Sequence, residues 1–531
     1  MFSSAHFDVF YYVGIAAVAI YSKKLLIDRN RPQPWPWTYL ILGSIALLAG
    51  RLPALLFNHE LSPDENLILT QTLTLQKGSA VFWKDVDGST AGPLNAYFLL
   101  ILSYLTGFSG FVLGRLASML CTWVSWILLV LMLRKWLKGR LLVYQLAIFP
   151  LGLLTVTLSP SLVAYRADLT ALVLLQLGMT LGAYGLDNGR QMLMLLSGAI
   201  FALVPFTQLS TIPVTCASIA LLISLAHRRG NAAVLIRSLA SGGGLALSLL
   251  FIGICLSQVV DSMLFYYFRR RELPPFSLPW NEPHQAIELP LFLGIMLLWV
   301  GYLLTARTRI TRPDLLVWVL MTGALLYSLS SGTSRFLLLI YPLTWLVAWL
   351  SETRQRLAPM PLAFSFLSGV VWLLCGLYAT LSQHRLTVYD EALAVAGSRQ
   401  QDEITMLLVH LARPDSRLVV WGQANALHVL SQLPQGTREN QVEFLLSRSR
   451  KLLAESRRRY LSDLVRNRPD LFVDYSGALS KASDIGQKFP ELYHYLQKNY
   501  EQVAEIAGVH IYRLRVLASG PEKLLPYESG S

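Results

Sequence analysis

The sequence predicts an α-helical protein that crosses a membrane many times and ends in a small α/β domain outside the membrane. Only 15% of its 531 residues are charged and 54% are hydrophobic, whereas a soluble globular protein has about 25% charged residues. The mean hydropathy is +0.47. The apolar residues also gather in blocks near the ~20 residues that a helix needs to span a bilayer. Together these observations exclude a soluble enzyme, a disordered chain and a fibrous repeat.

The apolar blocks predict about twelve transmembrane spans, and the charges between them predict the orientation of each span. Alternate loops are rich in Lys and Arg, as at residues 134–140, and the positive-inside rule places these loops in the cytoplasm. The formal charge of +13 therefore indicates membrane orientation rather than nucleic-acid binding. The expected spans are residues 8–27, 38–57, 111–133, 141–160, 168–186, 192–208, 211–226, 236–258, 289–306, 314–331, 336–350 and 361–381.

This alternation holds only if residues 93–107 do not cross the membrane. The segment is apolar but about fifteen residues long, which is short for a span and typical of an interfacial or re-entrant helix. Counting it as a span would place residues 134–140 outside. We therefore expect it to lie along the membrane within a long first extracytoplasmic loop, residues 58–110.

The composition changes near Gln383, and the chain beyond it predicts a second domain. Short β-like runs alternate there with helical stretches, which is typical of a small α/β domain: the β-like runs are 418–421, 471–473 and 510–512, and one helical stretch is 442–460. We expect three parts: a transmembrane domain at 1–382, an extracytoplasmic α/β domain at 383–518 and a tail at 519–531.

Two features of the apolar blocks bear on packing. The run Ser241-Gly242-Gly243-Gly244 lies at the cytoplasmic end of an expected span, where small residues predict close contact between helices. The four cysteines all lie inside apolar runs, where a thiol is usually a small packing residue. Their positions predict neither a disulfide framework nor a metal site.

The first candidate site is Asp64-Glu65, two adjacent acids that follow the second expected span. Carboxylates at a membrane surface can serve as a general base, a metal ligand or a group that positions an acceptor. The alternative is a helix start, with Ser62 as cap, Pro63 in the first turn and both acids favoured by the helix dipole. For the two acids at residues 85–87 of the same loop we expect a solvated turn.

The other candidates are charged residues on the same outer face. Asp168 begins an expected span and is costly if it faces lipid, so we expect it to face a cavity or to pair with Arg166. The run Arg269-Arg270-Arg271 suits either a specific phosphate or general headgroup binding. Arg335, at the outer end of a helix, either joins that phosphate site or snorkels to the interface.

Short motifs spread over most of the chain carry a family resemblance: Asp64-Glu65, Gln71, Leu75, Gly78, Trp83, Gly92-Pro93-Leu94, Tyr97, Gly107, Arg115, Asp168, Ser334-Arg335-Phe336, Tyr341-Pro342, Val419-Val420-Trp421-Gly422 and Pro469-Asp470-Leu471-Phe472-Val473-Asp474. They resemble the GT-C superfamily of membrane glycosyltransferases, most closely the branch of the protein O-mannosyltransferases and the lipid A aminoarabinose transferase. In that branch an acidic pair opens the first outer loop, and a Pro-Leu helix lies along the membrane before the next span. This chain departs from the pattern at Ala91-Gly92 and by an extra N-terminal span.

The resemblance implies a GT-C membrane domain of about twelve or thirteen helices with juxtamembrane helices in the first outer loop. It implies an inverting glycosyltransferase that moves a sugar from a polyprenyl-phosphate donor to an acceptor outside a bacterial-type inner (plasma) membrane. The implied partners are that donor, membrane lipids and an acceptor that is a protein, a lipid or a glycan. No nucleotide-binding loop is evident in the sequence, and no nucleic-acid partner is expected.

The resemblance also implies roles for the candidate residues. Asp64 would be the general base or the carboxylate that orients the acceptor. Glu65 and Asp168 would support it, by hydrogen bonds or through a divalent cation (Mg²⁺ or Mn²⁺) bound by Asp64 and Asp168. The substrate contacts would come from Tyr97 and from the phosphate-holding residues Arg335, Arg269, Arg270 and Arg271. Two other classes stay open, a transporter or lipid flippase and an envelope assembly protein that uses the α/β domain for docking.

The loop charges generate a topology prediction. In a background without the native cysteines, a reagent that cannot cross the membrane should label single cysteines at positions 64 and 440 from outside. Cysteines at positions 138 and 356 should react only after the membrane is opened, because their loops are rich in Lys and Arg. Labelling of 138 or 356, but not of 64 or 440, in sealed cells would reverse the assignment.

Overall fold

The computed structural model divides the chain into two compact units, Met1–Gly397 and Ser398–Ser531. It describes residues 4–28, 35–55, 60–77, 80–88, 91–138, 140–156 and 163–269, some residues between 317 and 349, and residues 399–422, 424–440, 445, 450–475 and 485–515. The expected domain boundary at Gln383 lies outside the described residues, as does the expected tail.

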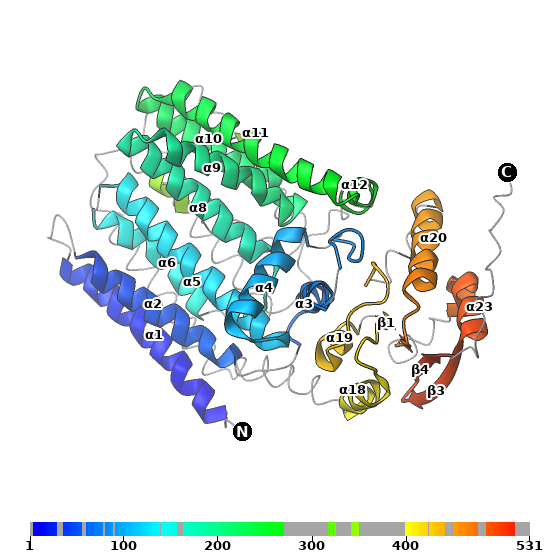
Figure 1. The fold of residues 1–531 in the computed structure, drawn as a ribbon. Helices are drawn as coiled ribbons and strands as arrows, with labels where there is room; N and C mark the ends of the chain where they lie inside the picture. The colour runs from blue at the N-terminus through cyan, green and yellow to red at the C-terminus, as the bar shows by residue number, and fades with distance from the viewer. Residues whose placement is uncertain are drawn as a thin grey trace. The chain divides into compact units, whose positions relative to one another are not determined.

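The first unit is helical throughout its described part. Long helices that follow one another in the chain lie side by side, from α1 and α2 through α5 and α8 to α9 and α11 (Figure 1). The helices are α1 Ser4–Ile27, α2 Pro36–Leu55, α3 Pro63–Gln76, α4 Pro93–Thr106, α5 Gly110–Trp136, α6 Leu142–Val156, α8 Ala167–Asn188, α9 Gln191–Leu203, α10 Ile212–Arg228, α11 Ala232–Leu256 and α12 Val260–Met263. Shorter turns are η2 Val204–Phe206, η3 Leu209–Thr211 and η4 Leu264–Arg269.

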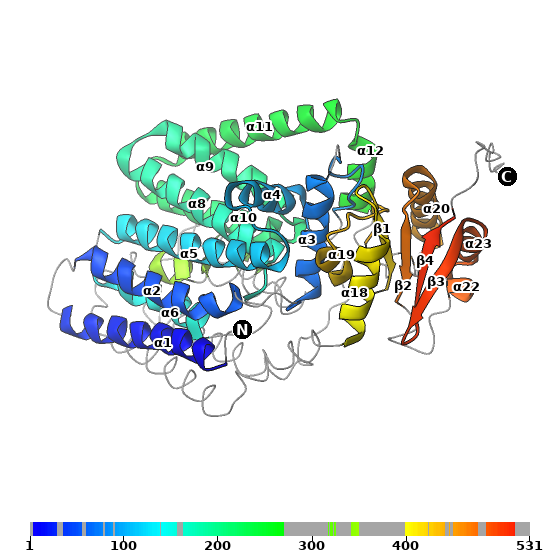
Figure 2. The same cartoon turned by 60° about the horizontal axis from the view of Figure 1, so that its bottom comes forward.

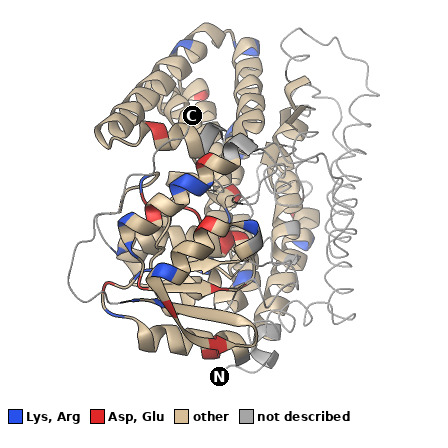
Figure 3. Cartoon of the chain, turned by 90° about the vertical axis from the view of Figure 1, so that its right-hand side faces the viewer, with Lys and Arg blue, Asp and Glu red and all other residues tan. Residues whose placement is uncertain are grey.

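Within the described residues, six helical segments are long and apolar enough to cross a membrane: Val9–Ile27, Pro36–Leu55, Gly110–Trp136, Ala167–Asn188, Leu209–Arg228 and Ala232–Leu256. Each coincides with an expected span, and charged side chains are sparse along the bundle (Figure 3). α9 is apolar but shorter than the span expected at 192–208, and the expected span 141–160 is described only as far as residue 156, the end of the apolar helix α6. Of the four expected spans after residue 288, those at 289–306 and 361–381 lie wholly outside the described residues, and those at 314–331 and 336–350 are described only in part. The chain is a multi-pass membrane protein, as predicted.

The segment expected to stay out of the bilayer forms the short apolar helix α4. Its 14 residues rise roughly 21 Å, well short of the ~30 Å hydrocarbon core. Gly92 precedes it in an extended conformation, Pro93 occupies its first turn, and Gly107 ends it at φ +73, a left-handed conformation that favours glycine. The sequence prediction of a helix too short to span is therefore confirmed.

Aromatic side chains join helices within the bundle. The ring of Trp126 on α5 lies where a side chain on Gly43 of α2 would stand, so the glycine allows the two helices to approach closely. Two described residues from the later part of the unit also reach the bundle. The hydroxyl of Tyr341 lies 2.9 Å from Ser125 Oγ, and Trp345 Nε1 donates a hydrogen bond to Gln176 Oε1 at 2.9 Å.

The second unit is built on a four-stranded sheet in the order β1-β2-β4-β3. β1 and β2 are parallel, with Leu418 paired to Leu471, and the β3–β4 hairpin completes the sheet in antiparallel fashion. Its elements are α18 Arg399–Leu411, β1 Leu418–Trp421, α19 Ala426–Ser431, α20 Arg450–Asn467, β2 Leu471–Asp474, α22 Ile485–Lys488, α23 Pro490–Asn499, β3 Tyr500–Ile506 and β4 Val509–Leu514.

Helices cover both faces of this sheet (Figure 2). Alternate residues of a strand point to opposite faces, so Leu418 and Val420 pack with α18 and α19, whereas Val419 and Trp421 pack with α20 and α23. Both β1 and β2 are buried along their whole length, which explains why they appear in the sequence as continuous apolar runs. The expected α/β fold of this part is confirmed.

One strand, β3, was not predicted from the sequence. It lies at the edge of the sheet, and its residues after Tyr500 are exposed or half-buried. An edge strand with charged residues lacks the apolar run that reveals β1 and β2. The helical stretch expected at 442–460 corresponds in its described part to α20, which begins at Arg450 and continues to Asn467.

Small residues let α9 and α11 pack backbone against backbone. A side chain on Gly242 would overlap the backbone carbonyl of Leu195, and one on Gly198 would overlap the backbone of Leu239. Gly244, two residues further along α11, has open space at the same position. The close packing predicted for residues 241–244 is therefore confirmed at Gly242.

This contrast generates a stability prediction. Gly242→Ala should destabilise the protein by about 1–3 kcal/mol, because backbone carbonyls cannot move aside as a flexible side chain can. The matched control Gly244→Ala should leave the thermal unfolding temperature in detergent unchanged or slightly raised, since alanine favours a helix. Equal unfolding temperatures for the two variants would show that the α9–α11 contact is looser than described.

Candidate active site

The acidic pair opens helix α3, as the local sequence predicts. Pro63 occupies the first turn, and Asp64 and Glu65 follow it within that turn. Ser62 is extended (φ −155, ψ 136) and makes no side-chain cap, so the expected Ser62 hydroxyl cap is absent. Its backbone carbonyl instead accepts the N–H of Glu65 at 3.1 Å. The helix start explains why acids stand here, but it does not explain which distant residues they contact.

Asp64 contacts Arg166, more than one hundred residues away in sequence. Arg166 Nη2 lies 3.1 Å from Asp64 Oδ2 and 3.8 Å from Asp168 Oδ2. Arg166 is the residue before α8, and Asp168 lies in the first turn of that helix. One guanidinium therefore joins the starts of α3 and α8, and the expected pairing of Asp168 with Arg166 is part of a larger cluster.

The three side chains of this cluster differ sharply in accessibility. Asp64 is 44% exposed, whereas Arg166 and Asp168 are 7% and 3% exposed. The cluster thus presents a single accessible carboxylate, Asp64, supported from behind by a buried cation and a second buried acid.

Glu65, the neighbour of Asp64, points into the protein. Its carboxylate forms a fully buried ion pair with Arg115 of α5 and accepts the backbone N–H of Tyr165 at 3.1 Å. Gly114 makes room for it, since a side chain there would crowd Glu65 Oε1. Burial raises the pKa of Glu65, and the positive charge of Arg115 opposes that rise.

A third acid, Glu60, lies just before this helix start. Burial raises the pKa of its carboxyl, while a hydrogen bond with the side chain of Asn66 lowers it and the nearby Glu65 raises it further. The three carboxylates of this short segment therefore have different surroundings. Asp64 is the one that pairs with Arg166 and is also 44% exposed.

The turn at residues 80–88 is more buried than expected. Asp87 is fully buried, and Gln71 Nε2 of α3 lies 3.4 Å from its Oδ1, so the expectation of a solvated turn is wrong for Asp87. Asp85 closes the turn by accepting the backbone N–H of Val81 at 2.9 Å. The acids in this turn hold the loop against α3.

The phosphate-binding candidates fall at the limit of the described residues. Arg269 is the last residue of η4, and Arg270, Arg271 and Arg335 lie outside the described residues. Tyr97, on α4, is 40% exposed, and its ring centroid lies 6.2 Å from that of Phe82. Its expected contact with substrate stays a prediction.

The acidic cluster does not fit a metal site. Among the described residues no three His, Cys, Asp or Glu side chains come together as a ligand set. Asp64 and Asp168 already share the guanidinium of Arg166, and Glu65 is paired with Arg115. The residues of the cluster therefore do not support the divalent cation considered for Asp64 and Asp168.

Two residues of the site were not assigned a role from the sequence. Arg115 lies within an apolar block, where an ionisable residue is itself a signal of function or pairing. Its partner, fifty positions away, is not encoded in any local pattern. Arg166 was expected to pair with Asp168, but its contact with Asp64 became visible only in the fold.

The described residues combine a helical membrane unit, in which an acidic pair opens α3, with a small α/β unit that follows it in the chain. This agrees with the fold class that the sequence predicted. No protein-family model and no curated protein sequence matches the chain.

Solved structures identify the similar proteins. Crystal structures of ArnT from Cupriavidus metallidurans match at TM-scores of 0.57 in the apo state and 0.55 bound to undecaprenyl phosphate. In both cases the identity is 13%, and the match covers 91% of this chain and 99% of that chain. The Archaeoglobus fulgidus oligosaccharyltransferase tethered with an acceptor peptide is matched at a TM-score of 0.43 and 11% identity, over 88% of this chain and 72% of that chain. At such identities the likeness to ArnT establishes the fold.

The two neighbouring acids generate a stability prediction. Glu65→Gln should destabilise the protein by about 3 kcal/mol or more, because it leaves the buried charge of Arg115 without its partner. Asp64→Asn is the matched control, since its carboxylate also pairs with an arginine but is 44% exposed, and it should cost less than about 1 kcal/mol. Thermal unfolding of both variants in detergent would contradict this assignment if the two shifts were equal.

Proposed function

We propose that this protein is an inverting glycosyltransferase that moves a sugar from a polyprenyl-phosphate donor to an acceptor at the extracytoplasmic surface of the inner membrane. The observation that carries the proposal is the accessible Asp64 carboxylate backed by Arg166 and Asp168. The GT-C fold supports it, since the similar ArnT is described in a complex with undecaprenyl phosphate. The sugar and the acceptor are left open, and the acceptor is a protein, a lipid or a glycan.

The proposed reaction is a single displacement at the anomeric carbon. An acceptor hydroxyl or amine attacks that carbon, its proton passes to Asp64, and the bond between the carbon and the phosphate oxygen breaks. The electron pair of that bond leaves with the polyprenyl phosphate. Attack from the face opposite the leaving group inverts the configuration. A carboxylate must be accessible to take the proton, and in this cluster that is Asp64.

The other members of the cluster act on Asp64 rather than on substrate. Arg166 restrains the Asp64 carboxylate through the 3.1 Å contact, and Asp168 holds Arg166 from the far side. The negative charge of the Asp64 carboxylate favours the positive charge that builds up on the sugar as the phosphate departs. Arg166 and Asp168 are therefore positioning residues, and Glu65 with Arg115 fixes the helix turn that carries Asp64.

The departing phosphate needs a cationic partner. We assign this role to Arg335 and to Arg269, Arg270 and Arg271, because guanidinium groups form paired hydrogen bonds to phosphate oxygens. On the topology predicted from the loop charges, these arginines and Asp64 share the outer side of the membrane. The α/β unit would lie on that same side.

The decisive test is Asp64→Asn. The substitution keeps the shape of the side chain but removes the charge, so transfer from a polyprenyl-phosphate sugar should fall roughly 10²–10⁴-fold, the range for loss of a positioned acid–base group. The rate is measured as release of polyprenyl phosphate together with glycosylated acceptor, using purified variants with confirmed equal unfolding temperatures.

The matched control is Asp187→Asn at the opposite end of α8. Asp187 is 36% exposed and pairs with Lys135 and Arg229, so it loses the same charge from a comparable setting and should transfer sugar at the parental rate. If Asp64→Asn keeps the parental rate, or if Asp187→Asn loses as much, the proposed site is wrong.

A further inference from the structure

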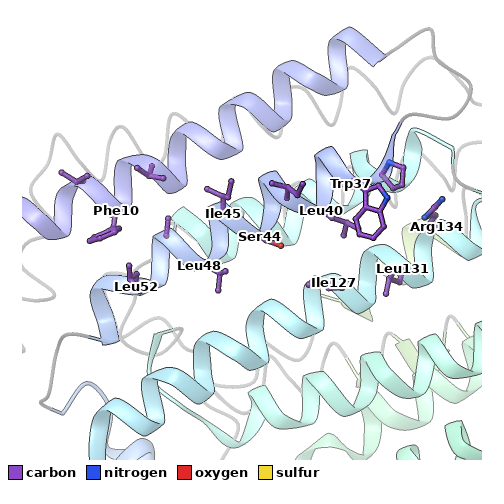
Figure 4. Close-up of a pocket in the computed structure, with 15 residues that line it drawn as sticks. Phe10, Trp37, Leu40, Ser44, Ile45, Leu48, Leu52, Ile127, Leu131 and Arg134 are labelled. Atoms are coloured by element: carbon purple, nitrogen blue, oxygen red, sulfur yellow. The ribbon is translucent and has the colours of Figure 1, made fainter. Parts of the chain in front are cut away.

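A large apolar pocket opens between helices α1, α2 and α5, distinct from the acidic cluster. Its volume is about 790 Å³, which lies within the range of ligand-binding cavities. We call it the α1–α2–α5 pocket. Figure 4 shows its lining, which includes Phe10, Ile45, Leu48 and Leu52. Several lining side chains, such as Ile41 at 56% exposure, are open to the surroundings of the helices.

The lining offers almost no group that would orient a soluble ligand. Of its residues only Trp37, Ser44 and Arg134 carry polar side-chain atoms. Ser44 is already engaged, because its hydroxyl accepts a hydrogen bond from Trp123 Nε1 at 2.9 Å. The interior therefore suits a hydrocarbon chain.

The pocket is long enough to hold one lipid chain. Trp37 and Leu52 lie towards its two ends in Figure 4, and the stretch of α2 between them rises roughly 22 Å. One leaflet contributes about half of the ~30 Å hydrocarbon core. The pocket can therefore hold the part of an acyl chain that crosses one leaflet, if the chain enters beside Trp37.

The two ends differ in charge. Trp37 and Arg134 lie together at one end of the pocket, and the opposite end, near Phe10 and Leu52, is apolar (Figure 4). Arg134 is exposed, and among the described residues it forms no ion pair with a carboxylate. Its neighbour Lys135 faces another partner, pairing with Asp187 at 2.6 Å. Arg134 is thus the one cation available at the mouth of this pocket within the described part of the chain.

We propose that the α1–α2–α5 pocket binds one acyl chain of an anionic glycerophospholipid, with the lipid phosphate held by Arg134. Tryptophan beside arginine is typical of the membrane interface, where headgroups lie. A guanidinium donates paired hydrogen bonds to phosphate oxygens, and the apolar lining replaces the neighbouring lipid tails. The site is independent of the proposed transferase reaction, because none of the acidic cluster lines it.

The test is lipid titration of the full chain by native mass spectrometry in detergent. The probes are phosphatidylglycerol and phosphatidylcholine with identical acyl chains, which differ in net charge. The parent should bind one phosphatidylglycerol about tenfold more tightly than phosphatidylcholine, because both lipids carry the phosphate but the cationic choline group of phosphatidylcholine offsets its attraction to Arg134. Arg134→Gln should remove this preference, and Ile45→Trp, which fills the pocket, should remove tight binding of both lipids.

Lys135→Gln is the matched control. It neutralises the adjacent cation, whose partner is Asp187, and it should keep the preference for phosphatidylglycerol. Equal loss in Lys135→Gln and Arg134→Gln would overturn the proposal, because the effect would then be general surface charge. Undecaprenyl phosphate that displaces phosphatidylglycerol from the parent but not from Ile45→Trp would also overturn it, by assigning the pocket to the donor lipid. If Ile45→Trp fails to fold, the comparison of the other two variants decides.

Discussion

The buried ion pair between Glu65 and Arg115 is the contact on which the packing around the start of α3 depends. Arg115 lies inside an apolar membrane helix, where an unpaired charge is strongly unfavourable, so a carboxylate must reach it. Glu65 does so from the first turn of α3 and also accepts the backbone N–H of Tyr165, just before α8. One side chain therefore fixes α3 against α5 and the start of α8, and Gly114 leaves the space that this contact needs.

Because Glu65 is held inward, Asp64 is held outward on the same helical turn. The two acids are chemically alike. They differ in exposure because the side chains of consecutive helix residues point about 100° apart. Asp64 meets Arg166 at the surface and stays accessible, whereas Glu65 is buried. The accessible acid suits proton transfer and the buried acid suits structure. A pair of adjacent carboxylates thus divides into one accessible group and one buried group.

The membrane sets the rest of the architecture. With no water to drive apolar surfaces together, helices in the first unit pack through small residues and close backbone contacts, as at Gly242 against Leu195. The second unit follows the rules of water-soluble domains, with a sheet buried between two helical layers. Between α1, α2 and α5 the described side chains line an open pocket. In a bilayer such a space is occupied at little cost by a lipid chain.

The sequence by itself determined the membrane class, the positions of the long helices, the short helix α4 and the buried strands β1 and β2. These features come from apolar blocks, loop charges and helix-start residues, which act over a few neighbouring positions. The tertiary structure decided which charges meet: Asp64 with Arg166, Glu65 with Arg115, and the burial of Asp87. It also decided that β3 is an edge strand. Such contacts join residues that are far apart in the chain. No local sequence pattern predicts these contacts, because the partner side chains come within reach of one another only after the helices have packed.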